Sequence, residues 1–354
     1  MSERPMTRDR QRHRAARSGR RFRGFTLIEL MVAMLLGLIV IGGVTSVFLA
    51  GQQTYRTNEA LGDVGDSSRI AFELLARDIR DAGLSGCDNS NGRIANVLNN
   101  TTLWYTDWND ALVGYDDAST DPALTGLSTG VPVAGTSSVH VLSTAATDVS
   151  VTWSASGGSG SPANLKINAA TSQLSTGQLI MVCDYDHATI MQITDYSGNQ
   201  VVVHNTGNKV SPGNCTKGVG YPPLCTANGT TYSFANNSRI AVLTAVDWYI
   251  GTNPLGGKSL YRLSVAYGAS GAASGTPQEM VRNVTNMKIS YLQPTSSGPG
   301  TAFGNAASVT NWAAVDAAQI QLTVNSANPR ASVNNGAPLQ RIFTSTTTVR
   351  NRVQ

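Results

Sequence analysis

The chain has 354 residues, of which 41% are hydrophobic and only 6% are aromatic, and its formal net charge is +4. Residues 1–24 hold nine Arg against Glu3 and Asp9, so the rest of the chain has 17 basic and 20 acidic residues, a net charge of −3. Because the net positive charge comes from this segment, the composition does not support nucleic-acid binding. It favours an interpretation of residues 1–24 as a topology signal that stays in the cytoplasm.

An uncharged run of 21 residues, 30–50, follows the basic segment. As a helix it would be roughly 31 Å long, enough to cross a bilayer. Glu29 stands at the head of this run, where a carboxylate costs about 2.5–3.5 kcal/mol if it lies deep in lipid, so we expect it to have a partner. Signal-peptidase cleavage after Ala50 is disfavoured by the bulky Phe48, and no Cys follows the run as a lipoprotein would need. The segment is therefore expected to stay attached.

The next 30 residues have helical periodicity. Their apolar residues recur at spacings of three and four and are surrounded by charged ones, which predicts an amphipathic helix. We expect one helix from Leu27 to Ala82, ended by Gly83, whose second half packs against a globular domain. Two helices broken near Gly51 are the alternative. The expected apolar stripe is Leu61, Val64, Ala71, Leu75 and Ile79.

From residue 84 onward, short β-branched runs bounded by Gly, Asn, Asp and Ser predict strands. The candidate strands are 139–142, 149–153, 178–183, 189–194, 200–204, 239–250, 259–267, 280–292, 317–324 and 341–349, with loops at 154–161, 268–275 and 296–304. The expected fold class is α+β: a long N-terminal helix, transmembrane in its first half and amphipathic in its second, packed on an enlarged antiparallel β-rich head of one or two lobes.

All four cysteines lie after the apolar run, which favours disulfides in an oxidising compartment. Cys215 and Cys225 close a short loop and are the favoured pair, which leaves Cys87 with Cys183. The sequence leaves the other two connectivities open.

The head shows neither a catalytic set nor a recognisable metal-ligand spacing. His140, His187 and His204 lie at no zinc spacing, and none has a nucleophile and an acid in a familiar order. The loop 298–304 resembles a dinucleotide fingerprint only superficially, since its spacing is wrong and it contains Pro299. We therefore predict a protein that is not an enzyme and uses no cofactor or metal.

Two acidic segments remain as weaker metal candidates. The stretch 107–121 offers oxygen ligands suited to calcium but lacks the D-x-D-x-D-G spacing, and the turn 184–186 follows a strand. The first is interpreted as a solvated loop and the second as a simple turn. The polar residues of the first are Asp107, Asn109, Asp110, Asp116, Asp117 and Asp121, and its expected anchors are Trp104, Tyr105 and Trp108.

The heptapeptide G-F-T-L-I-E-L at 24–30, between a basic leader and an apolar helix, resembles the processing site of type IV prepilins and type II secretion pseudopilins. The resemblance implies that prepilin peptidase cuts between Gly24 and Phe25 and methylates the new amine of Phe25. It also implies that Glu29 meets the N-terminal amine of a neighbouring subunit in a fibre. The chain then divides into a leader (1–24), a transmembrane assembly segment (25–50), an amphipathic segment (51–83) and a periplasmic head (84–354).

Four later segments, 177–204, 259–262, 279–291 and 341–352, are similar to the PilW-type minor pilins. One departure from the major pilins is that Ser46 stands where they usually carry a helix-bending proline, while Gly37, Gly42 and Gly43 weaken the helix instead. Whether this part of the helix melts in a fibre stays open.

The resemblance implies a minor pilin that helps to initiate type IV pilus assembly and supports adhesion, twitching motility or DNA uptake. It would be inserted once in the inner membrane, with its head in the periplasm, and would become part of the extracellular pilus. The implied partners are prepilin peptidase, other minor pilins, the major pilin, a tip adhesin and the inner-membrane assembly platform. The alternatives are a type II secretion pseudopilin and a membrane-anchored periplasmic enzyme or metal-binding protein.

Overall fold

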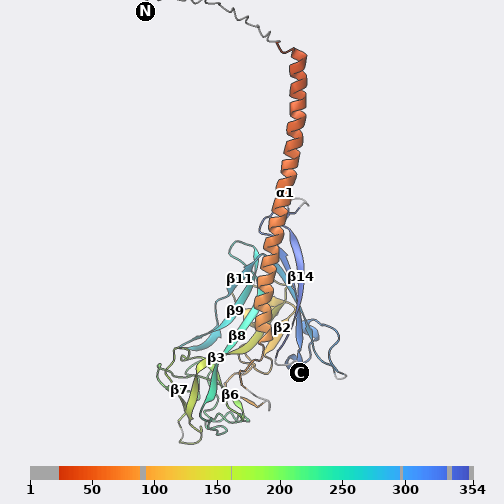
Figure 1. The fold of residues 1–354 in the computed structure, drawn as a ribbon. Helices are drawn as coiled ribbons and strands as arrows, with labels where there is room; N and C mark the ends of the chain where they lie inside the picture. The colour runs from red at the N-terminus through yellow and green to blue at the C-terminus, as the bar shows by residue number, and fades with distance from the viewer. Residues whose placement is uncertain (1–23, 88–92, 161, 296–297, 333–336, 351–354) are drawn as a thin grey trace, which may run out of the picture. The chain divides into compact units, whose positions relative to one another are not determined.

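The structure, a computed structural model, describes residues 24–87, 93–160, 162–295, 298–332 and 337–350 (Figure 1). The predicted leader therefore lies outside the described residues, except for Gly24. The chain divides into two compact units, Met1–Tyr55 and Arg56–Gln354.

A single helix, α1, runs from Leu27–Arg80 over 54 residues. The prediction of one helix is confirmed: α1 continues past Gly51, although it ends two residues earlier than expected. Gly83 adopts a positive φ of 71° just beyond this end, and its backbone N–H donates to the carbonyl of Leu142. This conformation costs glycine little, and it turns the chain away from the helix axis.

In the second unit, α1 buries one narrow stripe. Its residues are spaced by three and four, as a helix facing a core requires. The prediction of Leu61 in this stripe was wrong, because Leu61 is 39% exposed and the smaller Ala60 is buried in its place. The buried residues are Ala60, Val64, Ser68, Ala71, Leu75 and Ile79.

The described strands of the second unit form an eleven-stranded and a three-stranded sheet, and the large sheet has the central order β1-β6-β5-β8-β3-β4-β7. β2 pairs with β3, while β9 pairs with β8, β10 and β11; the small sheet has the order β12-β13-β14. Among the described strands, the pairing of β1 with β6 is parallel and the others are antiparallel. The predicted α+β class with an antiparallel-rich head is confirmed.

The bounds of the strands in chain order are Ile94–Asn96 (β1), Leu112–Tyr115 (β2), Ser138–Ser154 (β3), Asn164–Ile167 (β4), Leu179–Cys183 (β5), Ala188–Gln192 (β6), Val201–Val203 (β7), Ser238–Thr252 (β8), Lys258–Gly268 (β9), Gly271–Ser274 (β10), Gln278–Arg282 (β11), Val284–Leu292 (β12), Ala317–Asn325 (β13) and Gln340–Thr348 (β14). Short 3-10 helices lie at Ala118–Thr120 (η1), Pro122–Leu124 (η2), Ala306–Ser308 (η3) and Trp312–Ala314 (η4).

Four of the predicted elements were wrong in detail. The expected strands 139–142 and 149–153 are one strand, β3, because its polar middle pairs with β8 despite its weak propensity. The expected strand 280–292 is two strands, β11 and β12, separated at Asn283, whose φ of 62° interrupts the extended chain. The expected loop 268–275 contains β10, which forms a ladder with β9 from Gly and Ala residues.

The main core lies between α1 and the two sheets. Leu75 and Ile79 of the helix pack in one cluster with Trp248 and Leu260 of the large sheet and with Leu322 of the small one. Figure 1 shows the lower part of α1 beside β2, β8, β9 and β14. A second cluster contains β4–β7 residues such as Leu165, Ile180 and Val202 and none from α1.

Candidate functional site

The segment around Phe25 and Glu29 forms the start of α1. Phe25 is 82% exposed, and the apolar residues that follow it up to Leu49 are also exposed. By length and composition alone, α1 is apolar enough to cross a membrane. This unit therefore presents an apolar helix surface that nothing in the chain covers among the described residues 24–50.

Glu29 and Thr26 form a capping box at the first turn of α1. The backbone N–H of Glu29 donates to Thr26 Oγ1 at 3.3 Å. In return, Glu29 Oε2 accepts from the backbone N–H of Thr26 at 3.5 Å and from its hydroxyl at 3.4 Å. This reciprocal arrangement satisfies two N–H groups that the start of a helix leaves free. Glu29 thus has a role within its own chain, which the sequence analysis did not recognise in the pattern T-x-x-E.

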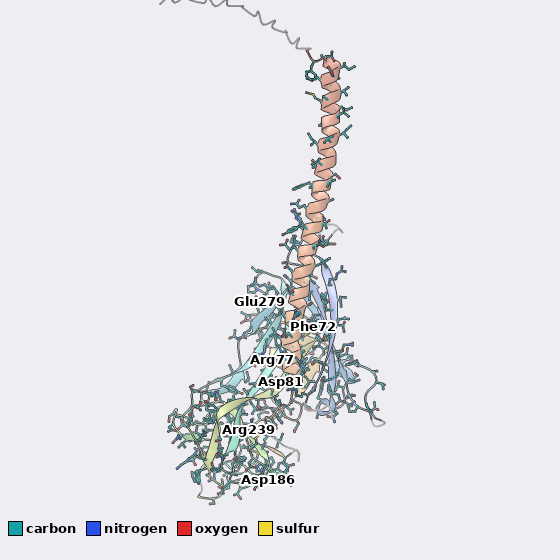
Figure 2. All side chains as sticks on the ribbon, in the orientation of Figure 1. Phe72, Arg77, Asp81, Asp186, Arg239 and Glu279 are labelled. Atoms are coloured by element: carbon teal, nitrogen blue, oxygen red, sulfur yellow. A yellow bond between two sulfur atoms is a disulfide. The ribbon has the colours of Figure 1, made fainter. Side chains whose placement is uncertain are left out.

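In the second unit, the last turns of α1 are joined to the large sheet by polar contacts. Asp78 Oδ2 accepts from Trp248 Nε1 at 2.9 Å and from Arg262 Nε at 3.0 Å. The Arg262 guanidinium also lies 5.8 Å from the centre of the Trp248 ring. A cleft runs beside these groups, and its helix side includes Arg77 and Asp81, labelled in Figure 2. These contacts fix the orientation of the helix on its sheet.

Both pairs of cysteines are disulfide-bonded in the structure. Cys87 is joined to Cys183 and Cys215 to Cys225, the pairs favoured from the sequence. The first disulfide ties the segment after α1 to β5, and the second closes a loop with a sequence separation of 10. Because no cysteine is free, none offers a thiol nucleophile.

The acidic stretch 107–121 is not the solvated loop predicted for it. It contains β2 and η1, and three of its carboxylates cap backbone N–H groups: Asp116 those of Ala306 and Ala307, Asp117 that of Ser119, and Asp121 that of Ala123. Asp121 is also only 1% exposed. The expected anchoring does occur, since Tyr105 and Trp108 are both buried.

The turn 184–186 has structural partners of its own. Asp186 binds Arg93 through one carboxylate oxygen and the His187 ring through the other, each at 3.0 Å. Asp184 accepts from the Tyr232 hydroxyl at 2.7 Å and caps the backbone N–H of Asp186. Figure 2 labels Asp186 at the lower end of the head. These contacts explain the turn without a metal.

The three histidines of the head lie apart, but one of them meets two carboxylates. His187 uses both ring nitrogens, on Asp186 and on the Val219 carbonyl. His204 is buried, and within the described part of the chain neither of its ring nitrogens has a hydrogen-bond partner. His140 lies beside Asp121 and Asp247 in a buried group of three metal-ligand residue types. The sequence analysis missed this group because its members are far apart along the chain. The sequence signal that could have indicated it is a histidine or an acidic residue flanked by apolar residues in a predicted strand, as at His140 and Asp247.

Comparison with known families identifies two regions of the chain. Residues 19–45 match the model of the prokaryotic N-terminal methylation motif, and residues 247–352 match that of the type IV pilus-assembly protein W. Searches of curated proteins and of solved structures returned no match.

The two regions agree with the geometry described above. The first contains the exposed apolar start of α1, and the second covers the C-terminal half of β8 and the strands from β9 to β14. The families indicate a structural pilin rather than an enzyme, and the apolar helix with its motif indicates membrane anchoring. The chain thus carries both sequence signatures of a type IV pilus minor pilin of the PilW family.

Proposed function

We propose that this chain is a minor pilin that co-assembles into the type IV pilus and helps to initiate its assembly. The observation that carries the proposal is the prepilin motif at 24–30 on an uncovered apolar helix, in a chain whose C-terminal third matches the PilW family. The PilW match also favours a pilus over a type II secretion system.

The proposed maturation begins at the junction of the leader and the helix. Prepilin peptidase removes residues 1–24 by cutting between Gly24 and Phe25, and it methylates the new amine of Phe25. Residues 25–50 then hold the protein in the inner membrane as its assembly segment, residues 51–83 support the head, and residues 84–354 form the head in the periplasm.

Assembly then depends on the charge of Glu29. A carboxylate in an apolar surrounding is stabilised by a cation that relieves its desolvation, and an N-terminal ammonium on a neighbouring subunit is such a partner. The apolar surface of α1 supplies the remaining contact area in the fibre. The proposed partners are other minor pilins, the major pilin, a tip adhesin and the inner-membrane assembly platform, and the resulting pilus supports adhesion, twitching motility or DNA uptake.

The cleavage site is tested by replacing the residue before the cut. Gly24→Ala should leave the leader attached, so the protein should run about 3 kDa heavier than the processed wild type on a gel. A processed band of wild-type size in this variant would refute the site. Phe25 methylation is read from the mass of the N-terminal peptide of the wild type.

The role of Glu29 is tested by separating its charge from its capping contact. Glu29→Gln keeps an acceptor for the capping box but removes the charge, whereas Thr26→Ala removes the cap and keeps the charge. We expect Glu29→Gln to reduce the amount of this chain in sheared pili and the number of pili. Thr26→Ala should affect both much less, with both proteins equally abundant in the membrane.

Two outcomes distinguish charge pairing from helix capping as the role of Glu29, and a third tests the role of the chain in initiation. Wild-type piliation and incorporation in Glu29→Gln would contradict the proposed charge pairing. Equal loss in Glu29→Gln and Thr26→Ala would assign the residue to helix capping instead. A deletion strain with normal surface pili would overturn the proposed role in initiation.

A further inference from the structure

A buried polar cluster lies on the face of the large sheet opposite α1. His140 on β3 and Asp247 on β8 are direct partners in the antiparallel register, so their side chains project from the same face. Asp121, the N-cap residue of η2, reaches the same point from the connection between β2 and β3. One ligand atom from each residue lies within 4.8 Å of the other two, and His140 Nδ1 is 3.9 Å from Asp247 Oδ2.

The polar atoms of this cluster are buried, and several are unpaired. Asp247 is 0% exposed, Asp121 1% and His140 5%. Among the described residues, Nδ1 of His140 and both carboxylate oxygens of Asp247 have no hydrogen-bond partner. Leaving such atoms unpaired destabilises the fold, since each has lost its contact with water. His140 and Asp247 therefore require a partner for these atoms, and Asp121 lies close enough to bind the same partner.

We propose that Asp121, His140 and Asp247 form a binding site for a divalent transition-metal ion, with zinc as the best fit. Two ionised carboxylates and a neutral imidazole bind a doubly charged ion as a group with no net charge, which removes the cost of burying the carboxylates alone. A proton shared between Asp121 and Asp247 would compensate only part of the buried charge. It would also leave Nδ1 of His140 without a partner among the described residues.

The surroundings of the cluster are those of a metal-ligand set. Asp121 Oδ1 accepts from the backbone N–H of Ala123 at 2.9 Å, and Oδ2 accepts from the Ser138 hydroxyl at 2.5 Å. Such bonds orient a ligating carboxylate while leaving lone pairs for the ion. The rings of Trp104 and Tyr115 lie 6.3 and 5.7 Å from the imidazole and shield it.

The ligand types select the kind of ion. Calcium and magnesium prefer sets made of oxygen atoms alone, whereas zinc readily combines imidazole nitrogen with carboxylate oxygen. Zinc bonds of about 2.0–2.2 Å would place tetrahedral ligand atoms roughly 3.4 Å apart. The 3.9 Å between His140 Nδ1 and Asp247 Oδ2 needs only a small side-chain adjustment to reach this value.

The three side chains leave one of the four tetrahedral positions of zinc to a water molecule. Because none of the three is more than 5% exposed, a substrate does not reach this position, and the ion is structural rather than catalytic. The ion would join the connection that carries η1 and η2 to β3 and β8. It would thereby hold this connection against the sheet face that carries Tyr249, Tyr261 and Leu263.

The test uses the full chain in detergent, stripped of metal with a chelator. Because the site is enclosed, the protein is unfolded with its disulfides intact and refolded with zinc, with calcium or without metal. We expect one tightly held zinc per chain by elemental analysis and a melting temperature raised by about 5 °C or more. Calcium should give neither effect. Refolding with Co²⁺ should give visible d–d absorption bands.

The variants separate this site from adventitious surface binding. Asp247→Asn removes a charged ligand, so it should fold without metal yet lose both the bound zinc and the thermal shift. Asp186→Asn is the matched control, since Asp186 also contacts a histidine but lies on the surface, and it should retain both effects.

Three results would overturn the proposal. The first is wild-type protein that refolds with no stoichiometric zinc and no thermal shift. The second is equal zinc binding by Asp247→Asn and the wild type. The third, which decides the case even if the variant does not fold, is a cobalt-treated wild type without absorption bands.

Discussion

Trp248 on β8 donates a hydrogen bond from its indole Nε1 to Asp78 Oδ2 on α1, over 2.9 Å. The same oxygen accepts from Arg262 on the neighbouring strand β9 at 3.0 Å. One carboxylate thus joins the helix to two strands of the large sheet. Asp78 lies near the end of α1, so its hydrogen bonds add to the apolar contacts of the buried stripe that ends at Ile79.

Replacing Asp78 by Leu should lower the free energy of unfolding by about 1–3 kcal/mol, because the Trp248 N–H would lose its acceptor in a partly buried place. Asp78→Asn should cost less, since its amide oxygen still accepts. The measurement is urea unfolding of the full chain in detergent, followed by circular dichroism. Glu73→Leu on the exposed side of α1 is the control and should change stability by less than about 0.5 kcal/mol. Equal effects of the two Leu variants would contradict the role of Asp78.

Gly114 on β2 makes room for the Tyr291 ring, and a Cβ built there would lie 1.8 Å from the tyrosine oxygen. Gly114→Ala should therefore destabilise the head by about 1–3 kcal/mol or more, since the ring must move within a packed core. Gly62→Ala is the matched control, because a Cβ at this helical position meets nothing within 4 Å. It should stabilise the protein by about 0.5–1 kcal/mol through helix propensity. Thermal unfolding should show melting temperatures that shift in opposite directions in the two variants. An unchanged melting temperature in Gly114→Ala would contradict the close approach of the Tyr291 ring to Gly114.

The two disulfides should contribute unequally to stability. Their sequence separations are 96 for Cys87–Cys183 and 10 for Cys215–Cys225. In the chain-entropy account, the longer loop restricts the unfolded chain more. The free energy of unfolding should therefore fall by about 4.7 kcal/mol when Cys87 and Cys183 are both replaced by Ser, and by about 2.8 kcal/mol when Cys215 and Cys225 are. Denaturant titration of the two double variants measures the difference. A larger loss for Cys215 and Cys225 would show that local strain or packing dominates instead.

Acidification should destabilise the head through His204. This side chain is 1% exposed and neither ring nitrogen has a partner among the residues that the structure describes, so burial lowers its pKa from 6.5 to about 4. The unfolded chain then binds more protons than the folded one between these pH values, and stability falls as the pH falls from 6.5 towards 4. The loss is about 3 kcal/mol over this range.

The contribution of His204 is isolated by comparing the wild type with His204→Leu, which has nothing to titrate at this position. Urea unfolding at pH 7 and at pH 4 should show a loss in the wild type that exceeds the loss in the variant by this amount. Identical pH dependence in both proteins would mean that His204 is accessible to water in the folded state.

The sequence predicted the elements whose pattern is local. The stripe of Val64, Ala71, Leu75 and Ile79 follows from helical spacing, and most strands follow from their β-branched runs. β1, β2, β4 and β10 escaped prediction because each has only three or four residues, too few for a pattern, and is a strand only through pairing with its neighbours. The division at Asn283 depends on a left-handed backbone angle, which asparagine tolerates. The presence of an asparagine in the sequence does not by itself predict this angle.

The buried cluster could not be predicted from spacing. Asp121, His140 and Asp247 meet only because the register of β3 against β8 places the last two opposite each other. Asp247 nevertheless stands between Val246 and Trp248 in the otherwise apolar run 245–251 of β8, and a charged residue in such a place is rarely accidental. The Thr26–Glu29 capping box was also predictable from the sequence, because the pattern T-x-x-E stands directly before an apolar run.

The long β3–β8 ladder has a consequence for how this head can diversify. The chain leaves the ladder after Val151 and re-enters it at Ser238, and because these two residues are direct partners, the two ends of the intervening segment lie close together. Figure 1 shows its strands β6 and β7 at the lower end of the head, and the core cluster around α1 contains no residue between Val141 and Val246. Replacing or lengthening this segment would therefore leave the apolar core around α1 in place, provided that the new segment kept Cys183, which is bonded to Cys87 beyond the helix, and the pairing of β5 with β8.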